Sequence, residues 1–206
     1  MDLSAPFQAI FPSVDSAVLT VLAGSTKPRT GREVARSAGR SQAAAQAVLS
    51  RLVDQGLVLM EVAGPARLYT LNRDHVAAPP IAELANLRSV FFRRLSDEVF
   101  QSWRPRPLHV SVFGSTARGD GGPDSDIDIF LVRPSSVDED DRKWQEQVEA
   151  LAHNVFLWTG NHAGISEVSE GDLERLRRER PAIVASLRAD AVDIQGKPLR
   201  ALLRRM

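Results

Sequence analysis

The chain contains no cysteine among its 206 residues, so neither disulfides nor thiolate-bound zinc are available to it. It also has no net charge, because 26 Lys and Arg balance 26 Asp and Glu, and this excludes a uniformly basic nucleic-acid binder. No apolar run approaches the ~18 residues that a membrane span needs, and the first residues, MDLSAPFQAIFPS, do not resemble a secretory signal. These absences predict a cytoplasmic protein without a membrane partner.

The N-terminal part, residues 1–76, shows the order helix, helix, tight turn, helix, hairpin. Apolar residues recur at helical spacing over Val14–Leu22. Thr30-Gly-Arg-Glu33 is typical of a capping box that opens a second helix, and Ser41 is a suitable N-cap for a third. The segments LVLMEV and ARLYTL flank a Gly-Pro turn and indicate a hairpin. This order predicts a winged helix-turn-helix domain.

A winged helix-turn-helix places its third helix in the major groove of DNA and its hairpin on the backbone or minor groove. Gln pairs with adenine, and Arg pairs with guanine or phosphate. The expected DNA-binding residues are Arg40, Gln42, Gln46, Arg51 and Arg67. Winged helices also act as protein-interaction modules, and the zero net charge keeps that alternative open.

Residues 77–104 contain a Pro-Pro pair near their start, followed by an apolar stripe. Its members recur at helical spacing and are Ile81, Leu84, Leu87, Phe91, Leu95 and Val99. This pattern predicts one long amphipathic helix, which either connects two domains or forms a homodimer interface.

Residues 105–206 alternate predicted strands with predicted helices, which indicates an α+β or mixed α/β domain with a small mixed sheet. Pro181 is expected at the first position of one of these helices. Within the stretch 109–132, HVSVFGSTARGDGGPDSDIDIFLV, Asp126 and Asp128 should project from one face of a strand. Two carboxylates ~4 Å apart repel by roughly 4 kcal/mol at an effective dielectric of about 20. A magnesium ion would compensate for this repulsion, and the alternative is a solvated strand face.

The dipeptide Gly114-Ser115 lies where a predicted strand meets the start of a helix, and such junctions favour anions. Arg118 adds a positive charge one turn later, so this junction is suited to phosphate. A Walker A loop, a dinucleotide fingerprint and an EF-hand loop each fail here on specific residues. A phosphate-binding junction beside paired aspartates predicts a nucleoside triphosphate site.

The stretch GSTARGDGGPDSDIDIFLV resembles the signature of the DNA polymerase β-like nucleotidyltransferases, in particular their small minimal members. The resemblance implies that Gly114 allows close backbone approach, that Ser115 contacts the terminal phosphates, and that Asp126 and Asp128 bind magnesium. The family also uses a third carboxylate on a neighbouring strand as metal ligand or general base. Glu167, in the segment GISEVS, is the expected residue for that role.

The activity implied by this resemblance is magnesium-dependent transfer of a nucleoside monophosphate from a triphosphate to an unknown acceptor, with a protein among the candidates. Two alternatives remain open. In one, the protein is a DNA-binding regulator whose nucleotidyltransferase-like domain only senses a nucleotide. In the other, it is an antitoxin whose partner protein is the acceptor.

Overall fold

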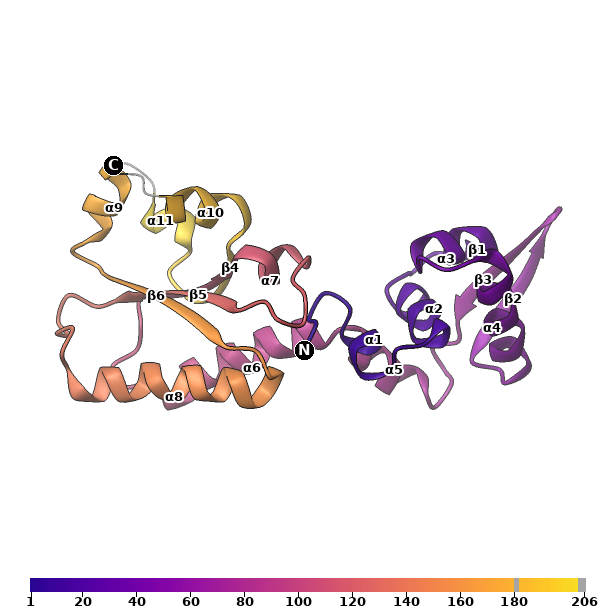
Figure 1. Ribbon diagram of the computed structural model, residues 1–206, viewed down its shortest axis with the longest axis horizontal. Coiled ribbons are helices and arrows are strands. Elements are labelled where there is room, and N and C mark those ends of the chain that lie inside the picture. The colour runs from indigo at the N-terminus through magenta and orange to yellow at the C-terminus, as the bar shows by residue number, and fades with distance from the viewer. Residues whose placement is uncertain (180–181, 204–206) are drawn as a thin grey trace. The chain divides into compact units, whose positions relative to one another are not determined.

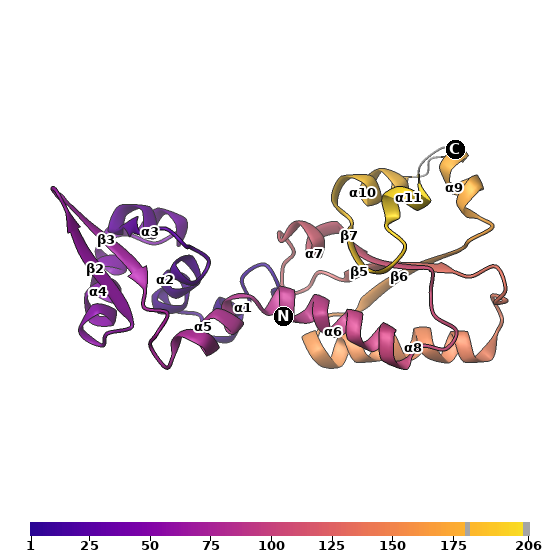
Figure 2. The same cartoon turned by 180° about the vertical axis from the view of Figure 1, so that it is seen from behind.

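The computed structural model describes residues 1–179 and 182–203 (Figure 1 and, from behind, Figure 2). The chain divides into two compact units, one comprising Ala5–Leu87 and the other comprising Met1–Ser4 together with the chain from Arg88 onward. Within the described ranges, no helix combines the length and apolar character that a membrane crossing requires.

The unit Ala5–Leu87 is a winged helix-turn-helix domain, as the sequence predicts. Its helices are α1 (Pro6–Ile10), α2 (Val14–Ala23), α3 (Gly31–Ser37), α4 (Gln42–Asp54) and α5 (Ala78–Ala85). Its strands β1 (Arg29–Thr30), β2 (Val58–Ala63) and β3 (Ala66–Leu71) form an antiparallel sheet in the order β1-β3-β2. Leu22, Leu49 and Tyr69 are buried where the helices pack on this sheet.

The predicted helix caps are confirmed. The Thr30 hydroxyl accepts from the Glu33 N–H at 3.3 Å, while the Glu33 carboxylate accepts from the Thr30 N–H at 2.8 Å. The Ser41 hydroxyl accepts from the Ala44 N–H at 3.2 Å at the start of α4. These caps satisfy N–H groups that the first turn leaves without helical partners, and they fix where α3 and α4 begin.

The helix expected over residues 77–104 is instead two helices, α5 and α6 (Leu87–Ser102), so the prediction of one continuous helix is wrong. Asn86 lies between them with φ −114° and ψ 24°, outside the helical region. Its side-chain amide donates to the Ala82 carbonyl at 2.8 Å, which replaces a backbone hydrogen bond of a continuous helix. The apolar stripe is therefore shared between two cores: α5 packs in the first unit, and α6 buries Phe91, Leu95 and Val99 in the second.

The second unit contains a four-stranded mixed sheet in the order β6-β5-β4-β7. Its strands are β4 (His109–Phe113), β5 (Ile127–Arg133), β6 (Ala163–Ser169) and β7 (Val192–Gly196). β4 is antiparallel to β5 and β7, and β6 is parallel to β5. The remaining helices are α7 (Gly114–Arg118), α8 (Arg142–Thr159), α9 (Leu173–Glu179), α10 (Ala182–Asp190) and α11 (Leu199–Leu202). Pro181 lies outside the described residues.

The two faces of this sheet are covered by different helices (Figure 1). Ile127, Ile129 and Leu131 of β5 form a core with residues of α6 and α8. Phe130 and Val132 form a second core with residues of α9, α10 and α11. Because side chains alternate along a strand, Asp128 belongs to the second face, and this assignment decides which residues can reach it.

Candidate active site

The two predicted metal-binding carboxylates lie at the start of β5. Asp126 directly precedes the strand and is exposed, while Asp128 is half-buried within it. Burial raises the pKa of Asp128, and the neighbouring negative charge of Asp126 raises it further. The structure therefore brings both carboxylates close enough for their charges to interact, as the sequence predicts.

Two glycines, one directly after β4 and one in β6, leave room for the Asp128 carboxylate. Gly114, directly after β4, has φ +69°, and a Cβ built there would lie 2.4 Å from Asp128 Oδ2. A Cβ built on Gly164 of β6 would lie 3.1 Å from Asp128 Oδ1. Any side chain at position 114 would combine an unfavourable backbone conformation with a steric clash, so this position requires glycine.

The loop between α7 and β5 is held by residues that the sequence motif does not reveal. The buried Asn161 amide donates to the carbonyls of Pro123, at 3.0 Å, and Ser125, at 2.9 Å. Ser115 of α7 faces the same loop, since a Cβ on Gly121 would lie 2.9 Å from its Oγ. Asn161 thereby fixes the backbone that leads into Asp126.

Arg118 binds two carboxylates, and only one of them comes from its own loop. Its Nε donates to Asp120 Oδ2 at 3.1 Å, and its Nη1 donates to Asp190 Oδ2 at 2.5 Å. The hydrogen bonds with Asp120 and then Asp190 raise the pKa of Arg118. Asp190 Oδ1 also accepts from the Gly114 N–H at 3.2 Å. Sequence reasoning missed Asp190 because it is the last residue of α10, far along the chain from the motif.

Arg88, at the start of α6, binds the C-terminal end of α7. Its Nη1 donates to the carbonyls of Thr116, at 3.4 Å, and Ala117, at 3.3 Å. A Cβ on Gly119 would lie 2.3 Å from this nitrogen, and Gly119 has φ +80°. A cation at the C-terminal carbonyls of α7 stabilises the turn that contains Ser115 and Arg118.

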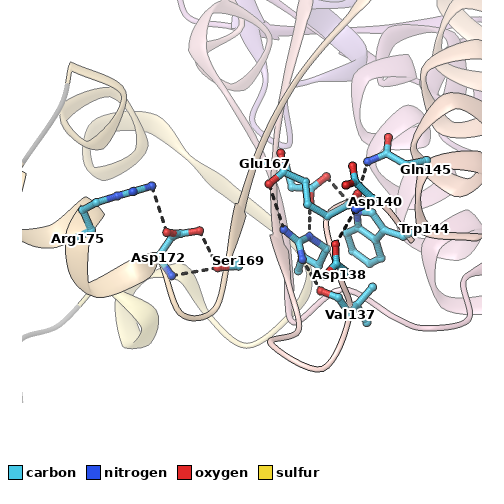
Figure 3. A network of polar contacts seen from close by, with 11 residues as sticks. Val137, Asp138, Asp140, Trp144, Gln145, Glu167, Ser169, Asp172 and Arg175 are labelled. Carbon is cyan, nitrogen blue, oxygen red and sulfur yellow. Dashed lines mark hydrogen bonds and ion pairs between the residues drawn. The ribbon is translucent and has the colours of Figure 1, made fainter. Parts of the chain in front are cut away.

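Glu167 lies on the opposite face of the sheet from Asp128. In the parallel register of β5 and β6, Gly164 is opposite Asp128 and Glu167 is opposite Leu131. The Glu167 carboxylate accepts from Arg133 Nε at 2.6 Å and from Trp144 Nε1 at 2.9 Å (Figure 3). The prediction that Glu167 is a metal ligand or general base beside Asp128 is therefore wrong. Among the described residues, no three His, Cys, Asp or Glu side chains form a metal-binding group.

The structure brings together three of the five expected DNA-binding residues. Gln42 and Gln46 of α4 and Arg67 of β3 line a hollow of about 410 Å³, and Gln46 Nε2 donates to the Tyr69 hydroxyl at 2.9 Å. The other two side chains are engaged elsewhere. Arg40 donates to Gln8 Oε1 at 3.2 Å, and Arg51 forms an ion pair with Asp15 of α2.

Comparison with known families identifies both halves of the chain. Residues 92–184 match the family model described as a nucleotidyltransferase domain, and residues 11–73 match that of the sugar-specific transcriptional regulator TrmB. No curated protein and no solved structure matches the chain. The protein therefore joins a winged-helix regulator domain to a nucleotidyltransferase domain, which is the fusion that the sequence motifs predict.

Proposed function

We propose that this protein uses magnesium to transfer a nucleoside monophosphate from a nucleoside triphosphate to an acceptor, and that its winged helix binds DNA. The observation that supports the transfer is the grouping of Gly114, Arg118, Asp126 and Asp128 at one end of β4 and β5. All four residues lie within the segment that matches the nucleotidyltransferase family.

The residues at this end of the sheet fit a magnesium site that is completed by substrate. Magnesium in proteins commonly takes one or two carboxylates and completes its shell with phosphate oxygens and water. Asp126 and Asp128 would supply the carboxylates, and the lack of side chains at Gly114 and Gly164 lets the Asp128 carboxylate lie against both backbones. Bound there, the ion would neutralise phosphate charge and favour attack at the α-phosphorus. The Gly114 N–H and the Arg118 guanidinium would donate hydrogen bonds to phosphate oxygens.

The reaction is an in-line displacement at phosphorus. A hydroxyl or amine of the acceptor forms a bond to the α-phosphorus, while the bond between this phosphorus and the oxygen bridging to the β-phosphate breaks. Pyrophosphate leaves with the electron pair of that bond. Glu167 lies on the other face of the sheet and does not receive the acceptor proton, which is released to the solvent. A protein is among the candidate acceptors.

Removal of the metal tests this proposal directly. Incubation with α-labelled nucleoside triphosphates, magnesium and a cell extract as the acceptor source should give a labelled product together with pyrophosphate. Chelation with EDTA should abolish labelling, and added magnesium should restore it. Labelling that persists at full rate after chelation would contradict the metal assignment.

The position of Glu167 favours a second candidate, a regulator that senses a nucleotide without reacting. The third carboxylate that the family resemblance implies on a neighbouring strand is not found on β6 beside Asp128, because Gly164 occupies that register position. In this case the extract experiment should give no labelled product, while the nucleotide still binds with magnesium. An antitoxin role would instead show one labelled partner protein.

The engagement of Arg51 by Asp15 predicts unequal effects of two exposed arginines on DNA binding. Arg67 is exposed on the hairpin side of the hollow, so its change to Ala should weaken binding about tenfold, as for a phosphate- or base-contacting arginine. Arg51→Ala should weaken binding less than about threefold, because its charge is already paired. Fluorescence anisotropy on a fragment selected from genomic DNA would measure both. Equal losses for the two variants would contradict the placement of the DNA on this hollow.

A further inference from the structure

Asp190 occupies the hydrogen-bond donors that a triphosphate would use. Its Oδ1 accepts from the Gly114 N–H at 3.2 Å, and its Oδ2 accepts from Arg118 Nη1 at 2.5 Å. Only 10% of the Asp190 side chain is exposed. A carboxylate that accepts two hydrogen bonds from an amide and a guanidinium offers these donors the same chemistry as a phosphate oxygen pair.

The backbone of Asp190 is fixed on both sides. Before it, Val184 and Leu187 of α10 are 3% and 2% exposed, and Leu187 lies in one core with Phe113. After it, the chain enters β7, where Val192 pairs with Val112 of β4. These packed and paired neighbours hold the backbone beside Gly114, while the carboxylate can turn by rotation of its side chain.

The Asp190 charge also acts on the carboxylates of the site. Asp190 Oδ1 accepts from the Gly114 N–H, and a Cβ on Gly114 would lie 2.4 Å from Asp128 Oδ2. Three carboxylates therefore concentrate negative charge where a polyanionic triphosphate would bind. Like charges at short range repel strongly when they are partly removed from water.

We propose that Asp190 is an internal competitor of the triphosphate. Its carboxylate holds Gly114 and Arg118 when no nucleotide is bound, and it releases both donors as phosphate oxygens replace it. The inference rests on the proposed nucleotide-binding function and deepens it: Asp190 lowers the affinity, so that the site fills only at high nucleotide concentrations. If Asp190 instead served only to anchor α7, its removal would weaken nucleotide binding.

Neutral replacements of Asp190 distinguish these two roles by the sign of their effect. Binding of the four ribonucleoside triphosphates and of inorganic triphosphate is measured by calorimetry with magnesium, for wild type, Asp190→Asn and Asp190→Ser. The competitor role predicts about tenfold tighter binding for both variants, with inorganic triphosphate included because the competition concerns phosphate alone. Asp120→Asn is the matched control: it removes the other, 61% exposed carboxylate from Arg118 and should change binding less than about threefold.

The outcomes separate failure of the inference from failure of the proposed function. Thermal unfolding first shows whether both Asp190 variants are folded. If wild type binds and the folded variants bind equally well or more weakly, Asp190 is not a competitor. If Asp120→Asn increases the affinity for triphosphate as much as the Asp190 variants do, then loss of either carboxylate partner of Arg118 is enough to increase it. This result would also overturn the assignment to Asp190. If none of the four proteins binds any triphosphate, the proposed function fails and the inference fails with it.

Discussion

Asp128→Asn should reduce nucleotidyl transfer by at least about a hundredfold, because the amide is a far weaker magnesium ligand than the carboxylate. At the same time, the variant should melt at a higher temperature than wild type. Burial and the charges of Asp126 and Asp190 raise the pKa of Asp128, so its ionised form is disfavoured in the folded protein. An amide of the same shape removes this repulsion, and opposite changes in activity and stability are typical of a functional site.

The gain in melting temperature should depend on pH in a defined direction. The folded protein holds the Asp128 proton to a higher pH than the unfolded chain does, so ionisation costs stability as the pH rises through the folded pKa. The gain from Asn should therefore be complete near neutral pH. It should shrink as the pH falls toward and below the ordinary Asp pKa of about 4, because the carboxyl then becomes protonated in the folded and the unfolded states alike.

A matched control comes from the same motif. Asp124 lies in the loop before β5, and its side chain is exposed. Asp124→Asn should leave transfer and melting temperature close to those of wild type. Calorimetric unfolding and the labelling assay measure both properties. Loss of activity together with a lower melting temperature in Asp128→Asn would indicate a structural role for Asp128 and contradict its assignment as a metal ligand.

Local chemistry explains which features the sequence predicted correctly. The capping box of Thr30 and Glu33 depends on residues three positions apart, and the Gly114-Ser115 turn depends on adjacent residues. The proximity of Asp126 to Asp128 likewise follows from their spacing of two residues at the start of one strand. Each of these features requires knowledge of one segment only, and each is present in the structure.

The features that failed or were missed depend on contacts between segments. Alternation places Ile165 and Glu167 on one face of β6. Only the register with β5 shows that Asp128 points to the other face of the sheet. Asp190 reaches Gly114 because α10 packs near α7, and no sequence spacing encodes that contact. The break at Asn86 could be predicted only by knowing that the apolar stripe is divided between two separate cores.

Glu167→Ala should lower the free energy of unfolding by about 3–5 kcal/mol, the usual cost of removing one partner from a buried ion pair. Arg133 is 9% exposed and donates to Glu167 at 2.6 Å, and its guanidinium also donates to the Val137 carbonyl (Figure 3). The fully buried Trp144 donates its indole N–H to the second carboxylate oxygen at 2.9 Å. Without Glu167, the Arg133 guanidinium loses its 2.6 Å partner and retains the Val137 carbonyl and Glu139 at 4.0 Å. The buried Trp144 N–H loses its acceptor, and both losses destabilise the folded state.

Urea unfolding of three variants would separate this structural role from catalysis. Glu170→Ala removes a 44% exposed carboxylate, 3.9 Å from Lys197, and should cost about 1 kcal/mol or less. The double variant Arg133→Met with Glu167→Leu should recover most of the lost stability, because both charges are replaced by apolar groups of similar size. Folded Glu167→Ala should bind nucleotide with wild-type affinity, since its side chain lies on the face of the sheet opposite Asp128. Weak binding with unchanged stability would instead place Glu167 in the nucleotide site and overturn the role assigned here.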